Sequence, residues 1–185
     1  MAKRYVMTVC YPLRQNAVLL GQQRLREGHR NLNAEQEFWN GPGGKVRDGE
    51  GILKANNREV KQECRLRMRY ARRLGIVLIT YEYEDFEVEL HFLTGTEYSG
   101  MPDLTLEMKL WKWFPVDVPP LDEMWPNDQY TFSRFMDGER LLGYFRYKSR
   151  KHLEIIGDPV ILSWGRKPLP QPRIITPAFF QTLSP

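Results

Sequence analysis

The stretch from residue 43 to residue 66 constrains this chain more than any other part, because a glycine-rich loop leads directly into an acidic segment. Its sequence is GGKVRDGEGILKANNREVKQECRL. Three glycines and Asp48 within its first seven residues are typical of a loop. The periodicity of residues 51–65 predicts a helix, whose candidate inward positions are Ile52, Leu53, Val60 and Leu66. We therefore expect a loop followed by a helix over 51–65.

Three polar side chains share one face of this predicted helix, because residues three and four apart on a helix are neighbours. They are Glu59, Gln62 and Glu63. Two carboxylates on one face repel each other unless a cation lies between them, and oxygen ligands suit Mg²⁺ or Mn²⁺. The alternative is a solvated helix face that pairs with Arg58 and Lys61. The helix alone leaves both interpretations open.

The spacing across the whole stretch resembles the Nudix box, whose pattern is G-x5-E-x7-R-E-U-x-E-E-x-G-U with U an aliphatic residue. The matching residues are Gly44, Glu50, Arg58, Glu59, Val60, Glu63 and Leu66. Two positions differ, because Gln62 replaces the first glutamate of the E-E pair and Arg65 replaces the late glycine. The resemblance implies a metal site that cleaves a diphosphate bond, and it favours the metal interpretation over the solvated face.

Strand-like segments surround this box and alternate with helical ones. β-Branched and aromatic residues predict strands at 4–11, 17–22, 74–84, 86–95, 107–115, 142–148 and 159–164. A second helix is expected at 122–137, stopped by Gly138, and residues 24–38 suggest a long loop. Strands interleaved with two helices predict an α/β fold, a Nudix-type α/β/α sandwich with a mixed central sheet and a helix on each side.

The length of 185 residues suits one domain with a substantial core. We expect this domain to span 1–164, because the remaining segment 165–185 is rich in proline. Residues 166–185 carry five of the thirteen prolines in the chain. This tail is expected to lie across the surface or to be disordered.

Charge and cysteine usage narrow the classes of partner. The net charge is +4, with arginines at 65, 67, 69, 72 and 73; such a surface favours anionic ligands such as nucleotides, or is simply solvated. Cys10 and Cys64 form no disulfide framework, which fits the cytoplasm. Apolar runs stay short of the ~20 residues that a membrane span needs. We expect a monomer that binds a small-molecule nucleotide, with no membrane partner; nucleic acid is disfavoured because the arginine run lacks interleaved aromatics beyond Tyr70.

Residues 5–164 resemble one branch of the Nudix family, the animal-type oxidised purine nucleoside triphosphate (8-oxo-dGTP) diphosphatases. The landmarks are Thr8, Val18-Leu19-Leu20-Gly21, Trp39-Asn40-Gly41, Gly43-Gly44-Lys45, Glu107-Met108, Met124-Trp125-Pro126 and Gly143-Tyr144-Phe145. The resemblance implies that the Gly43 carbonyl, Glu59 and Glu63 hold Mg²⁺ (or Mn²⁺). It also implies that Glu107 is a further metal-binding or water-positioning carboxylate.

The same resemblance assigns the groups around the metal and the base. Arg58 would orient the carboxylates by charge-assisted hydrogen bonds, and Gly44 and Lys45 would lie beside the phosphates. The base would meet Asn40, Trp125, Asn127 and Asp128, because tryptophan can stack on a purine and amide or carboxyl groups can bind its edge. Thr8 would form the pocket floor, and Ile79, Tyr81 and Met108 its apolar wall; plain core packing is the alternative for the wall.

Several positions differ from the branch and leave the substrate base open. The branch has two adjacent aspartates where this chain has Asn127-Asp128, and an Asn offers a donor and an acceptor that do not titrate. Gln23 replaces a lysine, Thr131 replaces an aromatic residue, and the loop at 24–38 is about seven residues longer. The expected function is metal-dependent hydrolysis of oxidised or modified purine nucleoside triphosphates to monophosphate and pyrophosphate, which would sanitise the nucleotide pool. The alternatives are another nucleoside diphosphate-linked substrate or a non-catalytic nucleotide-binding module, the latter motivated by Gln62 and Arg65.

Overall fold

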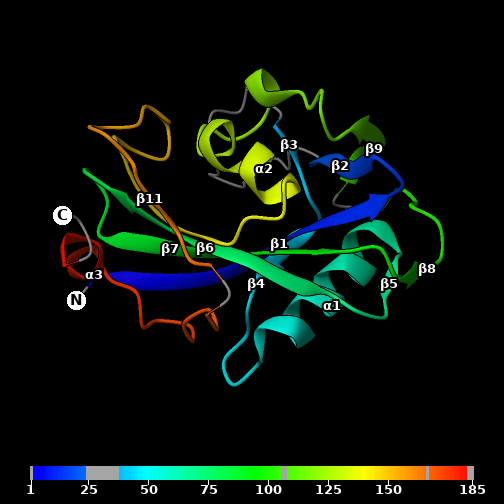
Figure 1. Ribbon diagram of the computed structural model, residues 1–185, viewed down its shortest axis with the longest axis horizontal. Coiled ribbons are helices and arrows are strands. Elements are labelled where there is room, and N and C mark those ends of the chain that lie inside the picture. Colours follow the sequence, from blue (N-terminus) through cyan, green and yellow to red (C-terminus); the bar gives the residue numbers. More distant parts are fainter. Residues whose placement is uncertain (1, 24–37, 106–107, 166, 183–185) are drawn as a thin grey trace.

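The computed structural model describes residues 2–23, 38–105, 108–165 and 167–182 (Figure 1). The strands are β1 (Lys3–Arg14), β2 (Ala17–Gln23), β3 (Trp39–Asn40), β4 (Gly43–Lys45), β5 (Arg67–Met68), β6 (Arg72–Tyr81), β7 (Phe86–Gly95), β8 (Tyr98–Ser99), β9 (Met108–Pro115), β10 (Leu141–Tyr147) and β11 (Val160–Ser163). The helices are α1 (Ile52–Cys64), a short 3-10 helix η1 (Leu121–Glu123), α2 (Asp128–Met136) and α3 (Pro177–Gln181). The predicted loop at 24–38 lies outside the described residues except for Phe38.

The main sheet is mixed, which confirms the predicted fold class. Its order is β11-β10-β6-β7-β1-β2-β3, with β4 paired to β1 and β9 paired to β2. The pairs β1–β7 and β6–β10 are parallel and the other pairs are antiparallel. β5 and β8 form a separate two-stranded sheet. The pairing of β4 with the middle of β1 fixes the glycine loop to the centre of the fold.

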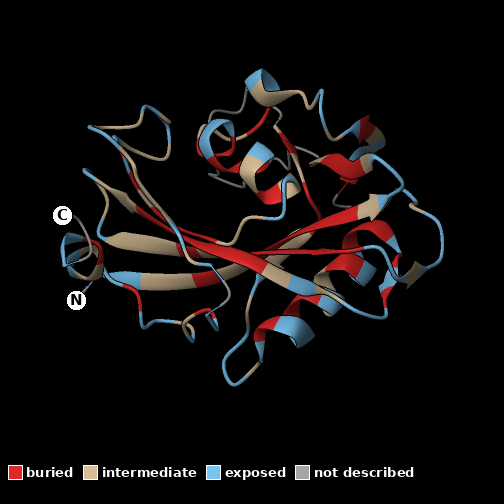
Figure 2. Cartoon of the chain, viewed as in Figure 1, coloured by how far each residue is buried: buried red, intermediate tan, exposed pale blue. Residues whose placement is uncertain are grey.

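The two long helices cover opposite faces of the sheet (Figure 1). Because successive side chains on a strand point to opposite faces, β1 contributes to both cores. Val9 and Tyr11 pack with Phe132 of α2, whereas Val6 and Cys10 pack with Val60 of α1. Figure 2 shows the buried residues concentrated along the sheet and on the inward sides of both helices. The predicted sandwich with one helix on each side is therefore confirmed.

The tail packs against the sheet. Its buried residues Leu169, Ile175 and Phe180 form a third apolar cluster with side chains of β6 and β10, namely Ile76, Leu78 and Leu142. The tail does lie across the surface of the sheet, as one of the two expected alternatives stated, and it includes the short helix α3. The division into a domain at 1–164 and a tail at 165–185 stays a prediction.

Several predicted element boundaries were wrong for identifiable physical reasons. α2 begins at Asp128 instead of 122, because the residue before a proline avoids helical geometry and Pro126 follows Trp125. Its end before Gly138, whose φ is 84°, was predicted correctly. β1 continues through Pro12 to Arg14, and the turn comes at Gln15 with φ 54°. Leu53 was expected to face inward but is 50% exposed.

Among the described residues, no helix has both the length and the apolar character needed to cross a membrane.

Candidate active site

The glycine strand β4 fits tightly between β1 and α1. Gly43 pairs with Val9 and Gly44 pairs with Thr8. A Cβ at residue 43 would lie 2.0 Å from the carbonyl oxygen of Thr8, and a Cβ at residue 44 would lie 2.6 Å from Cδ of Glu59. A larger residue at 43 would push against the backbone of β1, and a larger residue at 44 would displace the carboxylate of Glu59. Glycine is thus what allows the backbone to approach the carboxylates of α1.

Glu59 and Glu63 of α1 both lie against this strand. Glu63 is only 4% exposed, and its Oε2 accepts a hydrogen bond from the Gly43 N–H at 2.8 Å. The Glu59 carboxylate lies against Gly44, with 15% of its side chain exposed. The fold therefore brings Gly43, Gly44, Glu59 and Glu63 together, and their role as a metal site stays a prediction. Glu107 lies outside the described residues.

Arg58 ties the box together. Its Nε and Nη2 donate to the two oxygens of Glu50 at 2.9 and 2.7 Å, and Nη2 also donates to the carbonyl of Lys45 at 2.9 Å. Its Nη1 donates to Oε1 of Glu59 and, at 3.2 Å, to Oε1 of Gln62. The bidentate bond from Arg58 lowers the pKa of Glu50 to about 2. Arg58 therefore fixes the loop, through Glu50 and Lys45, and holds Glu59 in place.

A second polar cluster lies at the start of α2, on the other face of the sheet. Oδ1 of Asp128 accepts hydrogen bonds from the Tyr11 hydroxyl and from Nδ2 of Asn127, each at 3.2 Å. The Tyr147 hydroxyl donates to Oδ1 of Asn127 and accepts from its backbone N–H, both at 3.1 Å. All four residues are buried. Burial raises the pKa of Asp128 to about 7, although the bond from Tyr11 acts against that rise.

Aromatic side chains and a strand bridge extend this cluster. Trp125 packs on Phe38, with ring centroids 4.9 Å apart, and Tyr81 stacks on Tyr147 at 6.0 Å. Trp39 forms an isolated bridge with Met124, which sets the strand carrying Asn40 beside the segment carrying Trp125. Thus Asn40, Trp125, Asn127, Asp128 and Tyr81 come from distant parts of the sequence to one region.

A comparison of the sequence with known protein families shows which family this chain belongs to. The NUDIX domain family matches residues 3–135. The chain belongs to the Nudix family. It is a Nudix hydrolase by membership, and this family generally uses a divalent metal ion.

Individual relatives agree with the family assignment. The oxidized purine nucleoside triphosphate hydrolase of Danio rerio is 30% identical over 143 residues, which cover 77% of this chain and 86% of the relative. The enzyme of the same name from Mus musculus is 27% identical over 150 residues, or 81% and 91% of the two chains. The crystal structure of a MutT protein from Bacillus halodurans covers 89% of this chain and 99% of its own, with 25% identity and a TM-score of 0.69. A MutT structure from Methanosarcina mazei Go1, at 19% identity and a TM-score of 0.60, covers 74% and 96% and supports the fold alone.

The Nudix box of this chain has a donor set that fits Mg²⁺ or Mn²⁺. The Gly43 carbonyl, Glu59 and Glu63 are all oxygen donors, and Mg²⁺ is usually held by one or two carboxylates with the remaining ligands from substrate phosphates and water. Within the described ranges, no group of three or more His, Cys, Asp or Glu side chains is close enough to form a metal site on its own. The predicted set of ligands from the described residues is therefore two carboxylates and one backbone carbonyl.

Thr8 lies apart from the other predicted base-binding residues. It shares the α1-facing side of β1 with Val6 and Cys10 and pairs with Gly44, whereas Asn127 and Asp128 lie on the α2 side. Its buried hydroxyl has no hydrogen-bond partner within the described part of the chain. The structure thus places Thr8 beneath the Nudix box and not together with Asn127 and Asp128.

Sequence reasoning missed Tyr11, Tyr147 and Phe38, which contact Asp128, Asn127 and Trp125 respectively. Tyr11 and Tyr147 occur in apolar strands, and a tyrosine at a buried strand position needs a partner for its hydroxyl. That need was the available signal, but the partner could not be identified from the sequence.

A separate open hollow of about 590 Å³ lies beside the C-terminal end of α1. It is lined by Arg65, Arg67 and residues 99–103, and it contains none of the predicted site residues.

Proposed function

We propose that this Nudix hydrolase converts purine nucleoside triphosphates, oxidised or otherwise modified on the base, to the monophosphate and pyrophosphate. The observation that carries this proposal is the contact of two α1 carboxylates, Glu59 and Glu63, with the glycine strand β4. The similarity to oxidized purine nucleoside triphosphate hydrolases supports a purine substrate. The role would be to remove damaged nucleotides from the pool before a polymerase uses them.

The box residues have distinct tasks in this proposal. Gly43, Glu59 and Glu63 would hold Mg²⁺ or Mn²⁺, which when bound neutralises phosphate charge and lowers the pKa of an attacking water. Arg58 would keep Glu59 oriented, and Lys45 would offset charge on the phosphates. As the water oxygen bonds to phosphorus and the bridging P–O bond breaks, Glu59 or Glu107 would accept the water's proton.

The buried cluster at α2 would recognise the base. The side chain of Asn127 is already engaged, since its Nδ2 donates to Asp128 and its Oδ1 accepts from Tyr147. Asp128 takes part in that bond and also accepts from Tyr11, both on Oδ1. Its carboxyl group has a second oxygen, and we assign direct reading of the purine edge chiefly to Asp128, with Trp125 stacking on the ring and Asn40 beside it. A carboxyl group with a pKa of about 7 can donate or accept a hydrogen bond near neutral pH.

Pyrophosphate release tests the proposal directly. The purified protein is assayed with 8-oxo-dGTP, 2-hydroxy-dATP, dGTP and dATP, each with Mg²⁺ and with Mn²⁺. Release from a modified purine at a higher kcat/KM than from its undamaged parent is the expected result. Absence of release from all four with either metal would overturn the proposal.

A non-catalytic nucleotide-binding module is the second candidate, because Gln62 occupies a box position that is otherwise a carboxylate and bonds to Arg58. It predicts nucleotide binding by calorimetry without turnover, and recovery of turnover in Gln62→Glu. Turnover by the wild-type protein would exclude it.

A further inference from the structure

The hollow beside the C-terminal end of α1 carries an arginine where the Nudix pattern has a glycine. Arg65 is the C-terminal cap of α1, and its φ of 64° lies in the left-handed region. Glycine enters that region readily, whereas a residue with a Cβ is strained there. The chain therefore carries at this position a residue that is less favourable than glycine for ending the helix. Such strained residues are found where a side chain serves binding, so the surroundings of Arg65 were searched for a ligand site.

A second arginine lines the same hollow from the small sheet next to α1 (Figure 1). Arg67 of β5 pairs with Ser99 of β8, and directly opposite residues of an antiparallel pair have their side chains on one face. The next pair, Met68 and Tyr98, packs with the apolar cluster that includes Val60 of α1. Because side chains alternate along a strand, Arg67 and Ser99 point away from that cluster and toward the hollow that they line.

The loop after β8 closes the hollow against the end of α1. Gly100 has a φ of 96°, and a Cβ there would lie 3.0 Å from the carbonyl oxygen of Arg65. The N–H of Asp103 donates to the carbonyl of Cys64 at 3.3 Å, which fixes the loop to the helix. The hollow has a volume of about 590 Å³ and is lined by Arg65, Arg67 and residues 99–103. Its volume lies within the range of about 300–1,000 Å³ that is typical of small-molecule sites.

The charges around the hollow favour an anion. Within the described part of the chain, the side chains of Arg65, Arg67 and Ser99 make no hydrogen bond or ion pair. The carboxylate among the lining residues is that of Asp103, whose Oδ1 accepts the N–H of Leu104 at 2.8 Å. Two guanidinium groups against one carboxylate leave a net positive charge, and the serine hydroxyl is a further donor. The negative end of the α1 dipole opposes an anion, but this effect is weaker than a charge-assisted hydrogen bond from arginine.

We propose that this hollow is a second anion site, which binds a doubly charged phosphate group between Arg65, Arg67 and the hydroxyl of Ser99. The planar fork of arginine matches the oxygens of a phosphate. The phosphate is either inorganic or carried by a small organic molecule, whose hydroxyl groups can donate to Asp103. None of the residues assigned to the metal, the substrate phosphates or the base lines the hollow, so the site goes beyond the proposed function and does not depend on it.

Amide NMR spectra of the full chain, titrated with inorganic phosphate and separately with ribose 5-phosphate, test this site. Both titrations are run without divalent metal, at constant ionic strength set by chloride. The amide signals of Arg65, Arg67, Ser99 and Gly100 should shift along one saturable curve, while those of Gly43–Lys45 in the box stay in place. Equal affinities would identify the inorganic ion as the ligand, and tighter binding of ribose 5-phosphate would identify an organic phosphate; both support the site. Shifts at the box alone, or no saturable shift, would overturn it.

Arg65→Gly is the sharpest variant, because it restores the residue of the Nudix pattern and removes one phosphate ligand. Phosphate affinity should fall about tenfold, as expected for a lost charge-assisted hydrogen bond. The Tm should rise by about 2–4 °C as the left-handed strain is relieved. Arg67→Ala should weaken binding to a similar extent without that rise.

Arg69→Ala is the matched control for these variants. Arg69 is an exposed arginine of the same basic run, but it does not line the hollow, so its removal should change phosphate affinity by less than about twofold. Equal weakening in all three variants would mean that the whole basic surface attracts phosphate, and the site would be overturned. Unchanged affinity in Arg65→Gly and Arg67→Ala would overturn it as well. Because neither titration contains a nucleoside triphosphate, the result is independent of whether the enzyme cleaves one.

Discussion

Two arginine–carboxylate clusters on this protein contrast in where their hydrogen bonds go. The first surrounds Arg58 on α1, where 18% of the arginine side chain is exposed and the glycine strand lies alongside. The second is centred on Glu89 and His91 of β7, whose side chains are completely buried. The first cluster lies on α1 itself, whereas the C-terminal tail covers the second through Arg173 and Ile175. The same residue types are thus placed beside an accessible site in one case and inside the protein in the other.

The Glu89 cluster binds the backbone of the tail. Both oxygens of Glu89 accept the Arg173 N–H, at 3.0 and 2.8 Å, while Arg4 bonds to Glu89 and to the carbonyl of Ile175. Arg73 lies 2.9 Å from Nδ1 of His91. Because arginine can only donate, Nδ1 must accept, and the proton of a neutral His91 lies on Nε2, which donates to Glu89 at 2.7 Å. These bonds serve the fold, whereas those of Arg58 hold a carboxylate at the candidate metal site.

The largest effect expected from this contrast is on turnover. Glu63→Gln keeps the shape of the side chain and an acceptor for the Gly43 N–H but removes the charge that a metal ion requires. We expect kcat/KM for the best triphosphate to fall by about 10²–10⁴-fold, the range typical of a lost catalytic group, with little change in unfolding free energy. Kinetics and urea unfolding of the same preparation measure both. A variant that unfolds readily but retains turnover would mean that Glu63 belongs with the structural cluster instead.

The converse variant is Glu89→Gln, which should damage stability more than catalysis. Removing one partner of a buried charged network costs about 3–5 kcal/mol, and here Arg4 loses one of its two carboxylate partners and keeps Glu87. Urea unfolding should report that loss, and turnover per folded molecule should stay close to the wild-type value. If instead turnover collapses while stability holds, Glu89 acts at the active site and the contrast is wrong.

The sequence predicted the first cluster well because its members are close along the chain. Their spacing puts Glu59 and Glu63 on one face of a helix, and the resemblance to the Nudix box added Gly43 and Gly44 from the loop just before it. The helix expected at 51–65 was found at Ile52–Cys64, and the strands expected at 74–84 and 86–95 were found as β6 and β7. Local pattern was sufficient there, since loop glycines and periodicity carry the information.

The buried clusters could not be predicted, because their partners are distant in sequence. Glu87, Glu89 and His91 alternate with apolar residues along β7, which by itself would suggest that one face of the strand is exposed to solvent. The N–H of Arg173 in the tail nevertheless covers Glu89. Similarly, Tyr11 reaches Asp128 across 117 residues. Only the tertiary fold reveals which polar strand positions are buried.

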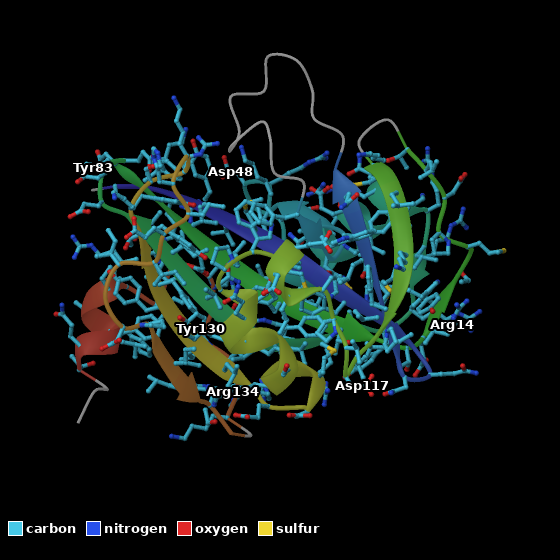
Figure 3. The ribbon with its side chains drawn as sticks, turned by 90° about the horizontal axis from the view of Figure 1, so that it is seen from above. Arg14, Asp48, Tyr83, Asp117, Tyr130 and Arg134 are labelled. Atoms are coloured by element: carbon cyan, nitrogen blue, oxygen red, sulfur yellow. The ribbon has the colours of Figure 1, made fainter. Side chains whose placement is uncertain are left out.

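A third variant tests whether Arg58 acts by orienting the carboxylates or only through its positive charge. Arg58→Lys keeps the positive charge but loses the planar fork that reaches Glu50, Glu59 and Lys45 together. We expect turnover to fall about 10–100-fold, as is typical when a group that orients a metal ligand is removed, with a small loss of stability. Arg134→Lys is the matched control, because Arg134 makes a similar two-pronged bond to Glu139, and Figure 3 shows Arg134 well apart from Asp48 of the box loop. Equal losses of turnover in both variants would argue against a positioning role for Arg58.

The smallest expected effect is a pH dependence of stability, and it distinguishes two buried carboxyl groups by the sign of its slope. Burial raises the pKa of Asp128 from 3.8 to about 7, since its hydrogen-bond partners Tyr11 and Asn127 are neutral. Burial would also raise the pKa of Glu89, but the bonds from His91 and the Arg173 N–H, with the charge of Arg4, lower it overall. The stability linked to Asp128 is therefore fully present below pH 3.8 and is lost as the pH rises through about 7. The stability linked to Glu89 is present above its unfolded pKa of about 4.5 and is lost as the pH falls.

Urea unfolding between pH 4 and pH 8 measures these slopes against variants that cannot titrate. Relative to Asp128→Asn, the wild type should lose stability as the pH rises from 4 to 7, by at most about 1.4 kcal/mol per pH unit. Relative to Glu89→Gln, the wild type should gain stability as the pH rises from the acid end of the range. Slopes of the same sign would mean that Asp128 is ionised by a positive partner, such as a bound cation, and its assignment to reading a neutral purine edge would then fail.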